Sequence, residues 1–109
     1  MKICLSPVNM DKQLTASVSG DIITINGQVL DLSPLQEGDT LPAGAIDSPW
    51  ILGDVSRIGG DIHLTVVMPY WGNAPKETRF PAAYSVPMTV LEGDVPLPPY
   101  DAEQLEVLP

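Results

Sequence analysis

Residues 14 to 32 read LTASVSGDIITINGQVLDL, and this stretch constrains the fold more than any other part of the chain. Apolar and polar residues alternate along it with the period of two that is typical of a half-buried strand. The dipeptides Gly20-Asp21 and Asn26-Gly27 favour tight turns between antiparallel strands. Two-residue turns at both dipeptides would place one apolar row on a single face, consisting of Leu14, Ala16, Val18, Ile23, Ile25, Leu30 and Leu32. This agreement predicts a three-stranded antiparallel meander.

The second half of the chain predicts further hairpins. Residues 50 to 69 contain Gly59-Gly60-Asp61 between two strand-like runs, and a two-residue or a three-residue loop fits this sequence. The returning strand carries one apolar row, consisting of Ile62, Leu64, Val66 and Met68. A third pair of strands is expected on the two sides of a turn at Gly93-Asp94. Pro87 restricts the first strand of this pair to a sheet edge or a bulge, because proline cannot donate to a strand ladder.

The remaining segments predict ordered loops and a tail. Residues 33–49 are rich in Pro, Gly and Asp, and we expect Leu35, Leu41 and Ile46 to anchor them as a crossover. The 12 prolines and 9 glycines of the chain interrupt long helices. We therefore predict an all-β fold, a small single-domain antiparallel sandwich or open barrel built from hairpins and a meander, with long Pro-rich loops. Residues 1–97 would form the β domain and residues 98–109 an acidic, extended C-terminal tail.

The charge of the chain excludes several classes of partner. Five Lys and Arg residues stand against 14 Asp and Glu residues among 109, for a formal net charge of −9. Nucleic-acid binders and proteins of anionic membrane surfaces carry clustered cations, so we expect neither nucleic acid nor membrane as a partner. The sequence has no apolar run long enough to span a bilayer and no secretory signal at its start, which favours synthesis in the cytoplasm.

The sequence offers no pattern typical of catalysis. His63 is the only histidine, and we expect it on a surface or second face; Cys4 is the only cysteine, and we expect it to be a small core residue. The carboxylates are scattered and mostly occupy turns, where Asp bonds to its own backbone. Phosphate-binding and nucleophile motifs are absent from the sequence. We therefore expect no catalytic, cofactor-binding or metal-binding residue, no cofactor and no enzymatic activity.

One segment combines aromatic and cationic residues in a way that is typical of protein interfaces. Residues 68–81 read MPYWGNAPKETRFP and contain two of the chain's five cations. Tyr and Trp provide large contact areas with few rotatable bonds, and Arg adds planar hydrogen bonding. The candidate partner-binding residues are therefore Tyr70, Trp71, Lys76 and Arg79.

A second interpretation of this segment stays open. Trp71 and Phe80 would cover the small core while Lys76 and Arg79 neutralise nearby acids. The two interpretations are compatible, because a loop fixed by its aromatic residues can still present its charges.

Three segments of the chain carry a resemblance to known proteins: MKICLSPV at the start, NGQVLDLSPLQEGDTLP in the middle and NAPKETRFP later. With these segments the chain resembles short proteins of tailed bacteriophages and prophages that are associated with tail-morphogenesis regions. The resemblance extends over most of residues 1–100 and brings no catalytic residue with it.

The resemblance implies a non-enzymatic structural or interaction protein of a phage tail or baseplate. Such a protein would be assembled in the cytoplasm of the bacterial host and located in the virion. Its expected partner is a larger tail or fibre protein, and an oligomer within the virion is a further expectation. A transient assembly factor, or chaperone, for the tail or its fibres is the alternative, and a host-directed inhibitor is a less favoured one.

Overall fold

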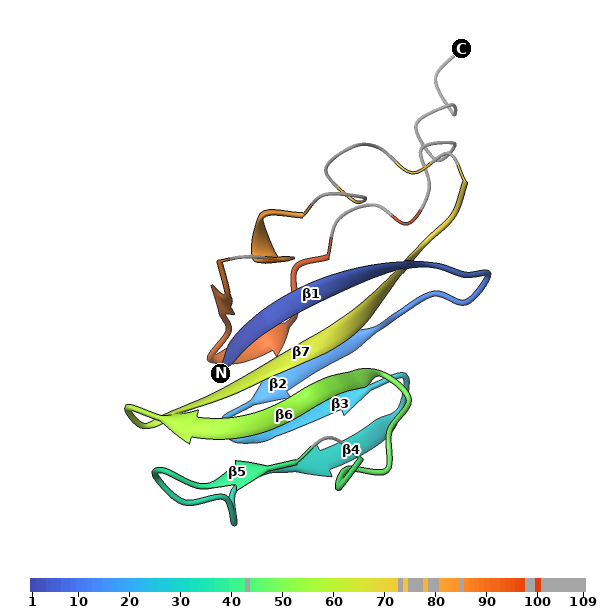
Figure 1. Cartoon of the computed structure of the whole chain (residues 1–109). Coiled ribbons are helices and arrows are strands. Elements are labelled where there is room, and N and C mark those ends of the chain that lie inside the picture. The colour runs from blue at the N-terminus through green and yellow to red at the C-terminus, as the bar shows by residue number, and fades with distance from the viewer. Residues whose placement is uncertain are drawn as a thin grey trace.

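Two β-sheets face each other across the apolar core. The computed structural model describes residues 1–42, 44–72, 74, 78, 81–84, 86–97 and 100. Sheet A has the strand order β5-β6-β7-β1-β8, and sheet B has the order β4-β3-β2-β9. Figure 1 shows β1, β7 and β6 in one layer and β2 and β3 behind them. The expectation of an all-β fold is confirmed, and neither sheet closes into a barrel.

The chain passes twice from sheet A to sheet B. The strands of sheet A are β1 (Lys2–Asn9), β5 (Thr40–Leu41), β6 (Ile51–Ile58), β7 (Asp61–Tyr70) and β8 (Met88–Thr89). Those of sheet B are β2 (Ala16–Ser19), β3 (Ile22–Ile25), β4 (Gln28–Asp31) and β9 (Glu92–Asp94). A short 3-10 helix, η1 (Ala82–Tyr84), precedes β8. Each sheet thus contains one meander of consecutive strands together with strands from distant parts of the sequence.

The meander β2-β3-β4 has the predicted register. Ile23 pairs with Val18 on one side and with Leu30 on the other. In the turn between β3 and β4, Asn26 has a φ of 48° and Gly27 a φ of 85°. Two consecutive positive φ angles are what a type I′ turn requires. The prediction is confirmed because the turn chemistry and the apolar alternation specify the same pairing.

The β6-β7 hairpin also forms, and it turns on two residues. Ile58 pairs with Asp61, so Gly59-Gly60 is the loop and the three-residue alternative is excluded. The register shifts between Leu52 and Ser56, which inserts extra residues into β6. Simple alternation could not predict the buried side of β6 for this reason.

Strand β1 lies parallel to β7, and this pairing was not predicted. Lys2 pairs with His63 and the ladder continues to Asn9 and Tyr70. Ile3 and Leu5 are buried in the core, whereas Cys4 is only half-buried and alternates with them on the other face. The expectation that Cys4 is a core residue is therefore wrong, because the alternation of β1 gives the core positions to its two apolar neighbours.

The third predicted hairpin is wrong, since its two strands enter different sheets. β8 pairs with the start of β1 in sheet A, and β9 pairs with β2 in sheet B. Gly93, which was assigned to the turn, lies inside β9 with a φ of 99°. Val90 and Leu91 connect the two strands and hydrogen-bond to residues beside both sheets. The Val90 N–H donates to the Met1 carbonyl next to β1, and the Leu91 carbonyl accepts from the Gly20 N–H next to β2. The strand carrying Pro87 was predicted at an edge or a bulge; the observed strand β8 begins at Met88, directly after Pro87, and lies at the edge of sheet A.

The crossover between β4 and β6 is anchored as expected. Leu35 is buried in the core, and Leu41 and Ile46 pack against it. Part of the crossover forms the edge strand β5, which pairs with β6. Arg57 of β6 holds its first half, because the guanidinium donates to the carbonyl oxygen of Leu35.

The core between the sheets is aliphatic. Its most deeply buried side chains come from both layers and comprise Ile3, Leu5, Ile23, Ile25, Val55, Ile62, Val66 and Met68. In the part of the chain that the structure describes, every buried side-chain nitrogen or oxygen has a hydrogen-bond partner. The sheets are thus held together by apolar packing without unsatisfied polar groups.

Candidate interaction surface

The end of sheet A at Tyr70 and Trp71 is braced by contacts from three segments. Tyr70 is half-buried at the end of β7, and its carbonyl oxygen accepts from Met10 N–H at 3.1 Å. Trp71 N–H donates to the Tyr100 carbonyl at 3.0 Å, and the Trp71 carbonyl accepts from Ala74 N–H at 2.9 Å. The Tyr100 hydroxyl donates to the Met10 carbonyl at 2.7 Å. These bonds fix the backbone around Trp71.

The Trp71 side chain remains exposed on this fixed backbone. Its exposed fraction is 44%, and it is not part of the apolar core. We call the surface formed by Met10, Tyr70, Trp71 and Tyr100 the Trp71 surface. Tyr100 falls in the expected tail 98–109, and the rest of that tail lies outside the described residues.

Of the four candidate partner-binding residues, the structure brings two together. Tyr70 and Trp71 are adjacent at the end of β7, as the sequence requires. Lys76 and Arg79 lie outside the described residues, as does Phe80. Their proposed roles stay predictions.

The histidine and the cysteine both lie in sheet A, on strands β7 and β1. His63 is half-buried, in register with Lys2 and Ser56 on neighbouring strands, and on the face opposite to Ile62 and Leu64. This confirms its expected place on the second face. Within the same residues, no cluster of three or more His, Cys, Asp or Glu side chains is placed to hold a metal ion.

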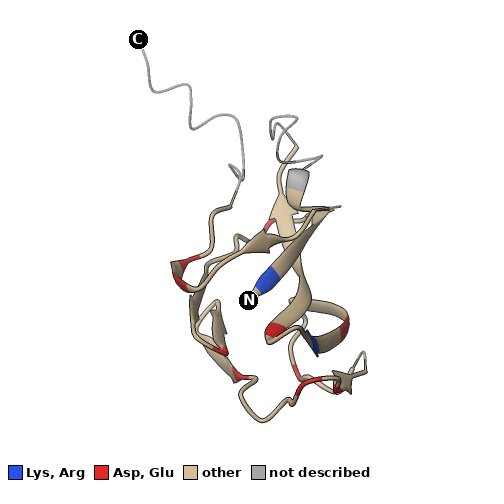
Figure 2. Cartoon of the chain, turned by 90° about the vertical axis from the view of Figure 1, so that its left-hand side faces the viewer, with Lys and Arg blue, Asp and Glu red and all other residues tan. Residues whose placement is uncertain are grey.

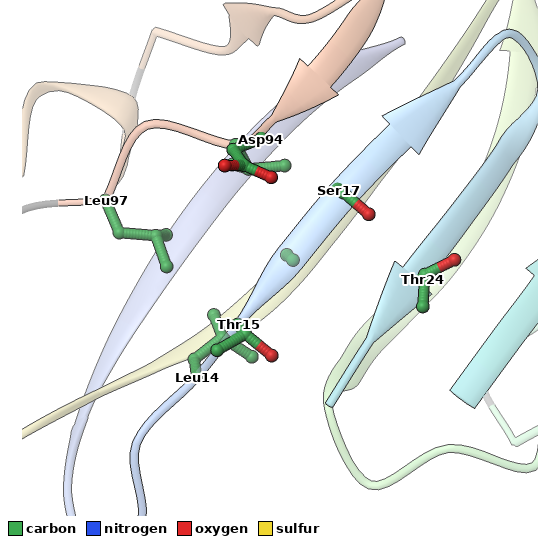
Figure 3. Close-up of a pocket in the computed structure, with 8 residues that line it drawn as sticks. Leu14, Thr15, Ser17, Thr24, Asp94 and Leu97 are labelled. Carbon is green, nitrogen blue, oxygen red and sulfur yellow. The ribbon is translucent and has the colours of Figure 1, made fainter. Parts of the chain in front are cut away.

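A pocket of about 370 Å³ opens where the chain after β9 leaves β2. The Val95 N–H donates to the Ala16 carbonyl at 2.9 Å, and beyond this bond Pro96 has no N–H to continue the ladder. Figure 3 shows Leu14 and Leu97 pointing toward each other across the gap, with Asp94 farther along, at the end away from Leu14. Ala16 and Val95 complete the apolar lining, and the polar lining consists of Thr15, Ser17, Thr24 and Asp94.

Strand β9 forms one edge of sheet B beside this pocket. All three of its residues are exposed. Val95 and Leu91, on either side of β9, both hydrogen-bond to the β2 side, at Ala16 and Gly20. In an antiparallel ladder every second residue bonds to the neighbouring strand, so the backbone of Gly93 also faces β2. The N–H and C=O groups of Glu92 and Asp94 consequently face away from the sheet. The sequence predicted a turn at these residues, and this edge strand was therefore missed. Pro96 could have indicated it, because a proline without an N–H ends a strand ladder.

Acidic residues are spread over both layers of the molecule. Figure 2 shows red segments along the two layers, whereas blue is confined to a few short segments. The cations of the described residues are Lys2, Lys12 and Arg57. Arg57 is paired with Asp21, and the Lys2 ammonium donates to the Thr89 hydroxyl. Strand β9 carries two acids, Glu92 and Asp94, which pair with Ser19 and Ser17 of β2.

The described residues contain no helix with the length and apolar character needed to cross a membrane. No protein-family model, curated protein or solved structure matches this chain.

Proposed function

We propose that the protein is a small, non-enzymatic interaction module of a bacteriophage tail or baseplate. In this role it binds a larger tail or fibre protein, is assembled in the bacterial cytoplasm and resides in the virion. Two independent arguments support the proposal. The sequence resembles proteins of phage tail-morphogenesis regions in three segments, and the fold presents an exposed aromatic side chain, Trp71, on an ordered backbone.

The observation that carries the proposal is the exposed Trp71 on its braced backbone. Aromatic anchors dominate the binding energy of many interfaces. An anchor contributes more when its backbone is already ordered, because less conformational entropy is lost on binding. Three hydrogen bonds hold the backbone at Tyr70, Trp71 and Ala74, and the indole side chain remains 44% exposed. This arrangement supports the interface interpretation of Trp71 over its interpretation as a cover of the core.

A transient assembly factor for the tail is the second candidate, and the charge of −9 favours it. An acidic protein can mask a basic surface of its client until assembly. Mass spectrometry of purified phage particles distinguishes the two roles. Stoichiometric presence in particles supports a structural part, and presence only in assembly intermediates supports a factor. Absence from both contradicts the whole proposal.

The Trp71 surface is tested by alanine substitution in the purified tail complex. We expect Trp71→Ala to weaken association by about 1 to 3 kcal/mol, the range of interface anchors, while the monomer remains folded. Val29→Ala is the matched control, because Val29 is an exposed apolar residue in the other sheet. Unchanged affinity in Trp71→Ala, or equal losses in both variants, would contradict this site. Lys76→Ala and Arg79→Ala test the sequence prediction for the cations in the same assay.

A further inference from the structure

We infer that the β9 edge and the adjoining pocket bind an extended, basic segment of a partner protein, which adds a strand to sheet B. This surface shares no residue with the Trp71 surface. The inference therefore goes beyond the proposed function and does not depend on the phage context.

The open edge provides the main-chain part of the site. Glu92 and Asp94 direct their N–H and C=O groups away from β2, and both residues are exposed. Added strands obtain their affinity from main-chain bonds of this kind. The other edge of sheet B is partly tied down, because the Gln28 side chain of β4 donates to the Asp47 carbonyl of the crossover. β9 is therefore the better edge for a partner strand.

The pocket provides the side-chain part of the site. Its volume of about 370 Å³ lies in the lower part of the range for ligand pockets. Leu14, Leu97 and Val95 supply apolar walls. Asp94 belongs to the same lining and is in register with Ser17 of β2 (Figure 3). A Lys or Arg side chain matches this lining, because its aliphatic stem packs on apolar surface while its charged end pairs with a carboxylate.

Charge selects the partner. The residues that line the pocket include Asp94 and no cation, and Glu92 adds a second negative charge on the same side of β9. Acids on an edge strand repel acidic strands, which protects against pairing with a second copy of this chain at a net charge of −9. The same acids attract a basic strand, so one feature excludes self-association and favours the proposed occupant.

The test uses the whole protein and a labelled ten-residue peptide in which lysine alternates with valine. A peptide of the same length with glutamate in place of lysine is the negative probe. Binding is measured by fluorescence anisotropy at near-physiological salt, and amide hydrogen exchange is measured by NMR with and without the lysine peptide. We expect saturable binding of the lysine peptide and no saturable binding of the glutamate peptide. We also expect exchange at the Glu92 and Asp94 amides to slow by about tenfold or more, since these groups become hydrogen-bonded.

Two variants separate the site from general charge attraction. Asp94→Asn and Asp47→Asn each remove one negative charge from an exposed position, but Asp47 lies in the crossover and does not line the pocket. We expect Asp94→Asn to weaken peptide binding about tenfold, equivalent to about 1.4 kcal/mol, and Asp47→Asn to change it less than about twofold.

Five outcomes would overturn the inference, four of them in the peptide experiments. These four are no saturable binding, equal weakening in the two variants, equal binding of the glutamate peptide, and exchange protection that does not include Glu92 and Asp94. Protection of these two amides in the free protein as its concentration rises would identify a second copy as the occupant, and would also contradict a basic partner.

Discussion

The guanidinium of Arg57 donates to the Asp21 carboxylate at 2.8 Å and joins the two sheets at one end of the molecule. Arg57 belongs to β6 of sheet A, and Asp21 lies in the turn between β2 and β3 of sheet B. The Arg57 side chain is 14% exposed and that of Asp21 is 38% exposed. The same guanidinium donates to the carbonyl oxygens of Leu35 and Gly60. One side chain thus connects both sheets, the crossover and the β6-β7 turn.

Arg57→Ala should lower the free energy of unfolding by about 2 to 3 kcal/mol, because it removes several hydrogen bonds of a charged donor. Asp21→Asn should cost less, about 1 kcal/mol or below, since Asp21 is partly exposed to solvent. Urea unfolding of the two variants measures both losses. Arg57→Lys is the informative control, because an ammonium group cannot reproduce the planar array of donors. Full stability in Arg57→Lys would show that charge alone matters here.

Ile23→Ala should destabilise the protein by about 2 to 5 kcal/mol, the usual cost of a large-to-small change in a core. Ile23 is 0% exposed at the centre of the meander. Val29→Ala, one strand away on the other face, should change stability by less than about 0.5 kcal/mol because Val29 is 63% exposed. Thermal and urea unfolding provide the comparison. Similar losses in the two variants would contradict the assignment of the buried face.

Gly27→Ala should cost about 1 to 2 kcal/mol, since an L-residue with a side chain is strained at positive φ. Gly27 has a φ of 85°, and no atom lies within 4 Å of an added Cβ, so the cost comes from the backbone and not from a clash. Gly72→Ala is the matched control: space is equally open there, and its φ is not positive. Equal effects of the two substitutions on urea unfolding would argue against a type I′ turn.

The pKa of Asp31 lies below the ordinary value for aspartate, because the Ser33 hydroxyl and the Ser33 backbone N–H both donate to the carboxylate. A lowered pKa in the folded state means that the interaction stabilises the fold above the unfolded pKa, about 3.9. The stabilisation is lost as the pH falls through the lower folded value. NMR titration of the Asp31 carboxyl carbon should show this low pKa, and Ser33→Ala should raise it. An ordinary pKa in the unsubstituted protein would contradict the hydrogen bonds.

The aromatic residues of the Trp71 surface could be predicted from the sequence, but the segments that contact them could not. Tyr70 and Trp71 stand out in the sequence because aromatic residues beside cations are typical of interfaces. The brace around Trp71 depends on Met10 and Tyr100, which are distant from it in the sequence and approach it only in the fold. The pocket was missed for the same reason, since Leu14 and Leu97 meet only because β9 pairs with β2.

The sequence by itself determined those strand pairs that a tight turn connects. In β2-β3-β4 the turn residues and the apolar alternation specify the same register, so the meander could be derived from 19 consecutive residues, 14 to 32. Only the tertiary structure decided the parallel pairing of β1 with β7, the division of β8 and β9 between two sheets, and the bonds of Arg57 to three segments. Apart from the bond between Arg57 and Gly60, these contacts join residues separated by long stretches of chain. The pairing of strands that no tight turn connects depends on packing the apolar faces of both sheets into one core. No local sequence signal encodes this pairing.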